Sequence, residues 1–436
     1  MLKEKNAELK SAIAEGKQSE IKVMPSTSYT VKPRLTTLIS MKVLPGSMLI
    51  LHSNEEANSK KKLKLFSNED GMLYFHICPP REMESIATIL FDCHHDGKII
   101  RYPLELRFHS EPTKEMPAPP AERAVSKKNT NRNKLSDEEI ANLTDKELMD
   151  RGYPPRPDQK KYPQSYNSWL KLISIPFTSV APSFNTYGGS FHLGDSSGVS
   201  YSGTTQAQLP NGCGFELKST SGNAYSSVNG QWNVPDMHSD KPGMEACNFL
   251  VGFDSFDSDG DTIQLGTAMN VFDFRVFGTD VPIISNYAFL SAYIDSKIVG
   301  GTITNFSVSP GDDIVARAII VRDGVSTCVL CWVYNLTHLQ SSFMVTPLFS
   351  SDKIQGKSVS WLVSRVDSSL ADFGSVTMND AMAHSVNSNS EIGFLENEVV
   401  NERIQITMVS NDYSRTLATV KALRGNSMQF EWKAFD

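Results

Sequence analysis

Short hydrophobic runs, separated by clusters of Gly, Pro, Asn, Asp and Ser, recur along most of this 436-residue chain. Between about residues 28 and 110 the runs are rich in β-branched and aromatic residues, which favour strands. Pro45-Gly46 and Asp96-Gly97 are turn signals between such runs. The runs cover residues 35–44, 47–52, 62–66, 71–78, 86–93 and 98–108. This pattern predicts a small antiparallel β-sandwich domain over residues 20–112.

A different pattern follows in residues 113–162, which begin with a stretch rich in Pro, Lys and Asn. Ser136 precedes Glu139 by three residues, and Thr144 precedes Glu147 by three. This is the spacing of a capping box, so a helix is expected to start at each position. The proline-rich stretch after the second start cannot continue a helix. Residues 113–162 are therefore predicted to be a proline-rich and partly helical linker.

Residues 163–436 show almost no helical periodicity. Short β-branched and aromatic runs alternate with Gly, Asn, Asp and Ser clusters at intervals of about 8–15 residues, the spacing of strands in an all-β sandwich or jelly roll. The whole chain is thus predicted to be all-β, with a large C-terminal sandwich domain behind the smaller one.

Charge is distributed unevenly between the two parts of the chain. Residues 1–164 contain 27 Lys+Arg and 23 Asp+Glu, and the remainder contains 15 and 26, which gives the net charge of −7. The acidic second part argues against a polyanion such as nucleic acid as its partner. Six cysteines are too few for a disulfide scaffold. No cofactor and no metal are expected.

The first residues, Met1-Leu2-Lys3-Glu4, are charged and are not followed by an apolar stretch. We therefore expect no classical signal peptide, and read residues 1–19 as a tail or a short helix. No apolar run reaches the length that spans a membrane. These features predict a protein that is cytoplasmic or exported by a non-classical route. They leave its oligomeric state open.

A series of short motifs follows in the second part of the chain. Its members are Gly230-Gln231-Trp232-Asn233-Val234-Pro235, Leu250-Val251-Gly252-Phe253-Asp254, Ile263-Gln264-Leu265-Gly266, Tyr334-Asn335-Leu336-Thr337, Ser360-Trp361-Leu362-Val363 and Leu370-Ala371-Asp372-Phe373-Gly374. In this order the series resembles the glutamic peptidase (eqolisin) family over about residues 165–436. The resemblance implies a concanavalin-like jelly roll of two curved antiparallel sheets, with a substrate groove on the concave sheet.

The resemblance also implies a catalytic pair, in which a glutamate is the general base and a glutamine amide stabilises the oxyanion. Gln264 matches the glutamine. Ser360 occupies the position of the glutamate, and a serine hydroxyl has no accessible basic form near neutral pH. Because side chains alternate along a strand, Gln264 and Ser360 are predicted to face one another from neighbouring strands, with Trp361 on the opposite face.

Other residues of the same motifs and strands are expected to bind a ligand. They are Asp254, Trp232, Phe289, Tyr293 and Trp361. Aromatic side chains can form a stacking platform for an extended peptide or a sugar, although packing in the core would use the same residues. Leu250 stands where the family has a tryptophan, which indicates that the chemistry of the groove has changed.

Two polar stretches near the motifs are expected to have structural roles. Asp254, Asp257, Asp259 and Asp261 have the composition of a calcium loop. They lack the glutamate that closes an EF-hand, which favours a solvated turn. The Asn335-Leu336-Thr337 segment is expected to stabilise a turn.

The sequence therefore supports two functional hypotheses and a weaker third. The first is a catalytically weakened or inactive glutamic peptidase homologue that binds a polypeptide or a glycan. The alternative is an active acid endopeptidase in which Gln264 works with a relocated carboxylate, for which Glu391, Glu396 and Glu398 are candidates. The third is a β-protein whose N-terminal sandwich docks a partner. The position of a carboxylate relative to Gln264 discriminates between the first two.

Overall fold

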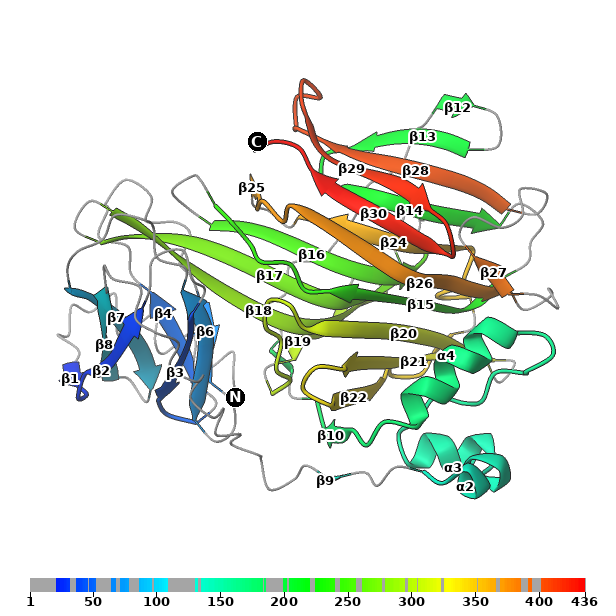
Figure 1. The fold of residues 1–436 in the computed structure, drawn as a ribbon, viewed down its shortest axis with the longest axis horizontal. Coiled ribbons are helices and arrows are strands. Elements are labelled where there is room, and N and C mark those ends of the chain that lie inside the picture. Colours follow the sequence, from blue (N-terminus) through cyan, green and yellow to red (C-terminus); the bar gives the residue numbers. More distant parts are fainter. Residues whose placement is uncertain are drawn as a thin grey trace. The chain divides into compact units, whose positions relative to one another are not determined.

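A computed structural model gives the fold of the chain (Figure 1). The described residues are 21–31, 37–45, 47–51, 64–67, 71–77, 86–95, 98–108, 130–131, 135–182, 184–185, 199–201, 204–219, 224–239, 244–255, 261–276, 279–294, 297–303, 305–322, 325–350, 352–365, 369–385, 391–393 and 401–435. The N-terminal residues read as a tail or short helix lie outside them.

The chain divides into two compact units, and neither is continuous in sequence. Unit 1 consists of Met1–Ser126, Ser239–Met244 and Val271–Ser285, and unit 2 of Lys127–His238, Glu245–Asn270 and Asn286–Asp436. The domains expected from the sequence are single stretches, because a hydrophobic pattern predicts strands but not which distant strands they pair with. Two segments from the middle of the chain belong to unit 1.

Unit 1 is built from strands at the predicted positions and from two that precede them. These are β1 (Ile21–Val23), β2 (Thr27–Val31), β3 (Thr37–Lys42), β4 (Met48–Leu51), β5 (Lys64–Phe66), β6 (Met72–Ile77), β7 (Ile86–His95) and β8 (Lys98–Phe108). One sheet has the order β1-β8-β7-β4-β5, with β2 also paired to β8. β1 and β2 run parallel to β8, which corrects the prediction of a purely antiparallel sandwich.

The second sheet of unit 1 includes a strand from far along the chain. β3 pairs with β6, and β6 pairs with β18 (Thr279–Ile294). The core of the unit contains Phe75 and Phe91, whose ring centroids are 5.4 Å apart, together with Phe272 and Ile283. Residues about 190 positions apart in sequence thus share one hydrophobic core.

Both predicted helix starts are present in unit 2. Helix α2 (Asp137–Asn142) and helix α3 (Asp145–Asp150) each begin with a complete capping box, in which the Ser136 and Thr144 side chains accept from backbone N–H groups. A third helix, α4 (Pro163–Ile173), was not predicted. Its first residue is a proline, which is well suited to the first turn of a helix. The strong β-pattern that follows it obscures its short amphipathic stretch.

The three helices form part of unit 2, and residues 113–162 are therefore not a simple linker throughout. Leu148, Tyr153 and Trp169 share a buried cluster with Ile140. The indole N–H of Trp169 donates to the carbonyl of Pro154 at 2.8 Å. The polypeptide between the predicted domains is thus packed from residue 135 onward.

Unit 2 contains two large sheets, of which the first, called sheet I, carries most of the predicted site. Its strands are β11 (Phe184–Asn185), β12 (Val199–Tyr201), β13 (Thr204–Leu209), β14 (Gly212–Ser219), β16 (Met244–Phe253), β17 (Thr262–Val276), β18, β19 (Lys297–Ile303), β24 (Ser358–Ser364), β25 (Ser369–Leu370) and β28 (Asn401–Val409). Neighbouring strands in its centre are β28, β14, β24 and β16, and β17 lies beyond β16.

The second sheet, called sheet II, faces sheet I across the core. Its strands are β9 (Thr130–Asn131), β10 (Thr178–Val180), β15 (Tyr225–Asn233), β20 (Asp313–Arg322), β21 (Ser326–Asn335), β22 (Gln340–Val345), β23 (Phe349–Ser350), β26 (Ser375–Ser385), β27 (Glu391–Gly393), β29 (Thr416–Leu423) and β30 (Ser427–Trp432). Strands β22, β21, β20, β15, β26 and β30 are consecutive neighbours.

The core of unit 2 lies between these two sheets. Phe249 of β16 meets Phe373 and Phe430 edge-on, at centroid distances of 5.5 Å and 5.7 Å. Trp232 of β15 donates its indole N–H to Oγ1 of Thr267 on β17 at 3.0 Å. Contacts of this kind between sheets confirm the predicted all-β sandwich.

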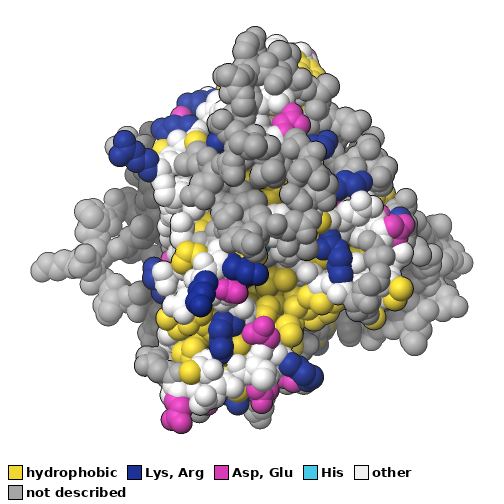
Figure 2. Space-filling view, turned by 90° about the vertical axis from the view of Figure 1, so that its right-hand side faces the viewer, with side chains coloured by type: hydrophobic (Ala, Val, Ile, Leu, Met, Phe, Trp, Pro, Cys, Tyr) yellow, Lys and Arg dark blue, Asp and Glu magenta, His cyan; other side chains and the backbone are white. Residues whose placement is uncertain are grey.

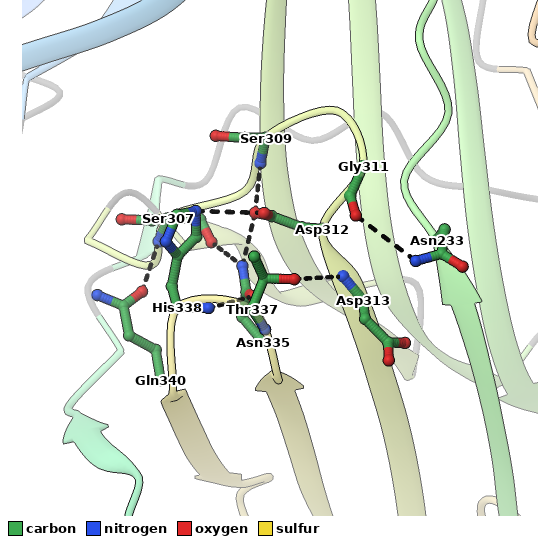
Figure 3. A network of polar contacts seen from close by, with 10 residues as sticks. All are labelled: Asn233, Ser307, Ser309, Gly311, Asp312, Asp313, Asn335, Thr337, His338 and Gln340. Carbon is green, nitrogen blue, oxygen red and sulfur yellow. Dashed lines mark hydrogen bonds and ion pairs between the residues drawn. The ribbon is translucent and has the colours of Figure 1, made fainter. Parts of the chain in front are cut away.

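The Asn335 segment forms the turn expected from the sequence (Figure 3). The Asn335 side-chain oxygen accepts from the backbone N–H groups of Thr337 and His338, both at 3.0 Å. Its amide nitrogen donates to Asp312 at 2.7 Å. Asp312 also accepts from the backbone of Ser309 at 2.7 Å. This buried network connects the β21–β22 turn to the segment before β20.

Figure 2 shows the side of the molecule on which the helices lie in Figure 1. Hydrophobic side chains form a patch there, bordered by charged side chains of both signs. Among the described helices, none has the length and hydropathy needed to cross a membrane.

Candidate functional site

The register of sheet I brings a carboxylate next to Ser360. Ser360 of β24 lies directly opposite Glu216 on β14, and on its other side it lies opposite Gly252 of β16. Residues directly opposite one another in an antiparallel pair project to the same face. Glu216, Ser360 and Gly252 therefore form one row across three strands.

Gln264 extends this row onto β17. A Cβ atom built on Gly252 would lie 3.2 Å from Cγ of Gln264 and 2.9 Å from Oγ of Ser255. Oγ of Ser255 is in turn 2.7 Å from Oγ of Ser360, within hydrogen-bond distance. The Gln264 and Ser255 side chains thus converge above Gly252, which has no side chain of its own to obstruct them.

The predicted facing of Gln264 and Ser360 needs one correction. Both lie on the same side of sheet I, but strand β16 separates them. With strands about 4.8 Å apart, their Cα atoms are about 10 Å from one another, and those of Gln264 and Glu216 about 14 Å. Ser360 and Gly252 are small, so the space between the two longer side chains is not filled by a large residue on this row.

Trp361 and Trp232 lie on the core side of the sheets. The indole N–H of Trp361 donates to the carbonyl of Asn229 on β15 at 2.8 Å. Trp361 thus points towards sheet II, and the Glu216 row occupies the opposite side, called the outer face. Both tryptophans are almost fully buried. Both pack in the core, and the ligand-binding role expected for them from the sequence stays a prediction.

The environment of Glu216 favours its protonated form. The side chain is 2% exposed, and this burial raises the pKa of its carboxyl group to about 7. A hydrogen bond from the Ser358 hydroxyl opposes the shift, and the nearby negative charge of Asp254 adds to it. A carboxyl group with a pKa near 7 can both accept and release a proton at neutral pH.

Asp254 holds the beginning of β24 in place. Its carboxylate accepts from the backbone N–H of Gly356 at 2.8 Å and from that of Ser358 at 2.9 Å. Its own backbone has φ of 53°, in the left-handed region that aspartate tolerates better than most residues. Asp254 therefore positions the strand that carries Ser360, and its two oxygens are occupied by the chain itself.

The two aromatic residues expected to bind ligand differ in exposure. Phe289 is buried in an apolar cluster next to the Glu216 row, whereas Tyr293 is partly exposed. The members of this cluster are Ala207, Leu209, Leu250, Ala268, Phe289, Leu362, Ile404 and Ile406. The outer face thus has an apolar part beside its polar row.

Most of the remaining candidate acids are not among the described residues. The side chain of Glu391, the residues Glu396 and Glu398, and the acidic residues between Ser255 and Asp261 are outside the described part of the chain. Asp261 forms an ion pair with Lys353 at 3.2 Å.

Sequence reasoning did not identify Glu216 or Ser255. Alternation between Phe215 and Leu217 places Glu216 on the face opposite to two buried apolar residues, where an acid is normally solvated. The only signal in the sequence is a single acid within an otherwise apolar run. Its partner Ser360 is 144 residues away, and that pairing becomes visible only in the fold.

The family model for the "Peptidase A4 family" matches residues 210–429, half of the chain, and this range includes Glu216, Gln264 and Ser360. The search of curated proteins gives no significant match. Scytalido-glutamic peptidase with a transition state analog inhibitor is a structural match at 15% identity, with a TM-score of 0.39 over 51% of this chain and 98% of that one.

Two further solved structures match at similar levels. SCP-B, described as a member of the Eqolisin family of Peptidases in a complex with a tripeptide, is 14% identical with a TM-score of 0.36 over 51% of this chain and 98% of that one. Aspergilloglutamic peptidase from Aspergillus niger is 20% identical, with a TM-score of 0.32 over 43% and 99%. On the family match, the chain belongs to the Peptidase A4 family, the glutamic peptidases or eqolisins that its motifs resemble.

Proposed function

We propose that this protein is an endopeptidase of the glutamic type in which Glu216 supplies the carboxylate that Ser360 cannot. The observation that carries the proposal is the pairing of Glu216 with Ser360 on the face that also presents Gln264. The carboxylate has moved by one strand relative to the position that the family motif implies. This is the relocated-carboxylate alternative, with an acid that the sequence did not suggest.

The chemistry follows from the two side chains. Ionised Glu216 removes a proton from a water molecule, whose oxygen attacks the carbonyl carbon of a peptide bond. The amide N–H of Gln264 donates to the oxyanion that forms. The proton held by Glu216 then passes to the leaving nitrogen as the C–N bond breaks, which returns the carboxylate to its starting state.

A weakened or inactive protein was the first expectation, because a serine occupies the position of the family base. Glu216 weighs against that expectation, because it supplies a titratable acid in the row. Its raised pKa supports activity near neutral pH. At mildly acidic pH, where the family is expected to work best, most Glu216 side chains would be protonated and unable to act as a base.

A second candidate is binding of a polypeptide or glycan without hydrolysis, and the burial of the row bears on both candidates. Glu216, Gln264 and Ser360 are each at most 2% exposed. A polymer can reach them only after the chain around the outer face moves. Hydrolysis and binding share this requirement, so the assay must measure both.

The test is digestion of casein and of a fluorogenic peptide library between pH 4 and pH 8. The Glu216→Gln variant should lose about 100- to 10,000-fold in kcat/KM, the usual contribution of a general base. Gln264→Ala should lose a similar factor. Glu431→Gln, which removes a carboxylate on sheet II, is the matched control and should cleave like the wild type.

Three outcomes separate the candidates. Wild-type activity that rises with pH and disappears with Glu216→Gln supports the proposal. Weak activity that is unchanged by Glu216→Gln but increased by Ser360→Glu would favour a weakened enzyme that lacks its base. Peptide binding without any cleavage by the wild type would favour the non-catalytic candidate.

A further inference from the structure

A second polar pair lies on the outer face, further along the strands that carry Ser360 and Gly252. Asn248 of β16 is directly opposite Ser364 of β24. Each is four residues from its counterpart in the Glu216 row, an even number, so both project to the same face as that row. The two pairs lie about 13 Å apart along the strands at about 3.3 Å per residue.

Both side chains are buried, and each has one polar atom without a hydrogen-bond partner among the described residues. Asn248 is 2% exposed and Ser364 is 0% exposed. Among the described residues, no group pairs with Nδ2 of Asn248 or with Oγ of Ser364. Buried polar atoms of this kind are rare in proteins, because an unpaired donor or acceptor retains its full desolvation cost. Two adjacent cases on one face indicate a position that is completed by a ligand.

An apolar step separates this pair from the Glu216 row. Leu250 and Leu362 lie opposite one another, halfway between the two polar pairs, and both belong to the apolar cluster of the outer face. Along the strands, the outer face therefore presents a polar pair, an apolar pair and a polar pair, each two residues from the next. An extended polypeptide has the same period, because alternate side chains project to the same side.

We propose that Asn248 and Ser364 form a subsite that hydrogen-bonds the main chain of an extended polypeptide about four residues from the bond at Gln264 and Glu216. The amide of Asn248 would donate to a substrate carbonyl, and the Ser364 hydroxyl would pair with the same peptide unit. The Leu250–Leu362 pair would contact an apolar side chain of the substrate two residues from that bond. This inference rests on the proposed function in one respect, namely that the scissile bond lies at Gln264 and Glu216.

The test uses capped, dye-labelled alanine peptides that contain one leucine. The total length is increased from four to twelve residues, in one series at the N-terminal end and in another at the C-terminal end. Affinity is measured by fluorescence anisotropy on the full-length Glu216→Gln variant, in which turnover is suppressed. Extension at one end should increase affinity abruptly at the length at which the peptide reaches Asn248 and Ser364, about four residues from the scissile bond. Each hydrogen bond is expected to contribute about fivefold, the usual size for neutral groups.

In the same background, Asn248→Leu and Ser364→Ala should each remove about fivefold of this gain, while the shortest peptides bind as before. Thr327→Val is the matched control, because Oγ1 of Thr327 is also buried and unpaired among the described residues but lies on sheet II. It should leave the affinity of every peptide unchanged. Ser364→Ala removes a single atom, so it tests the subsite even where Asn248→Leu does not fold.

The outcomes for the subsite are distinct from those for catalysis. Length-dependent binding that both variants weaken, without any cleavage by the wild type, would support the subsite and reject the peptidase proposal. Cleavage whose kcat/KM does not depend on length or on either variant would overturn the subsite alone. A higher melting temperature for both variants with unchanged peptide affinity would also overturn it, since the unpaired atoms would then be packing defects.

Discussion

At the residue scale, Glu216 couples the chemistry of the site to the stability of the fold. Its pKa is about 7 in the folded protein, against about 4.5 when exposed. Between these two values the folded protein keeps a proton that the unfolded chain releases. Stability therefore decreases as pH rises through this window. A shift of this size corresponds to roughly 3 kcal/mol.

The variant Glu216→Gln should remove this dependence. We expect it to be more stable than the wild type by roughly 3 kcal/mol at pH 8 and by little at pH 4.5. Urea unfolding at both pH values measures the difference. Glu431→Gln again serves as the control, because ion pairs with Lys433 and Lys421 lower the pKa of Glu431 and its loss should give no gain at pH 8. A Glu216→Gln variant that is destabilised at pH 8 would contradict the assignment of a buried, proton-binding carboxyl group.

Individual residues of the site differ in whether the sequence could predict them. Gln264 and Ser360 could be predicted as candidates because each lies within a recognisable motif. Glu216 and Ser255 were not, since each acquires its role from a neighbour more than a hundred residues away. Trp232 and Trp361 lie in motifs too, but the side of the strand on which they project assigns them to the core. A motif thus identifies a strand more reliably than it identifies the function of each residue on it.

At the element scale, helix α4 is attached to sheet II by a buried histidine. Ser165 of the helix is 2.7 Å from Nε2 of His384 on β26, and the ring of Tyr162 stacks on the imidazole at 4.1 Å. Burial, together with the positive charge of Arg317, lowers the pKa of His384 to about 3. The imidazole of the folded protein is therefore neutral above about pH 3.

This attachment should weaken in acid. Below about pH 6.5 the unfolded chain protonates His384 while the folded protein does not, so stability falls as pH decreases towards 3. The loss by pH 4 is roughly 3 kcal/mol. Melting temperatures at pH 7 and pH 4 should differ less for His384→Gln than for the wild type. His238→Gln, which changes an exposed histidine, should keep the wild-type difference; an unchanged difference for His384→Gln would refute the argument.

Local sequence signals explain which elements could be predicted. The capping boxes at Ser136 and Thr144 are complete within four residues, so both helix starts were predicted correctly. Helix α4 lacks a side-chain cap and was missed. Strands β3 to β8 have clear hydrophobic runs, but the parallel pairing of β1 and β2 with β8 depends on contacts between residues more than 70 positions apart.

At the scale of the whole molecule, limited proteolysis tests how the chain is divided. The composition of residues 113–134 predicts the first cuts there. Strand β9 pairs with β10, which places the expected cuts before Thr130. Mass spectrometry of the early fragments identifies the sites. First cuts within 165–430 would contradict the predicted boundary.

Hydrophobic periodicity was sufficient to predict an all-β chain with a smaller and a larger part. It could not predict that unit 1 also contains Ser239–Met244 and Val271–Ser285, because periodicity carries no information on long-range pairing. The pairing of Ile283 with Ile77 in β6 is the clearest instance.

Strand β17 has a consequence for regulation. It presents Gln264 in unit 2, and eight residues later it places Phe272 in the core of unit 1. One hydrogen-bonded strand is thus common to both. Coupling between two sites is reciprocal, so a ligand of unit 1 that binds more tightly when Gln264 is engaged must strengthen substrate binding by the same factor.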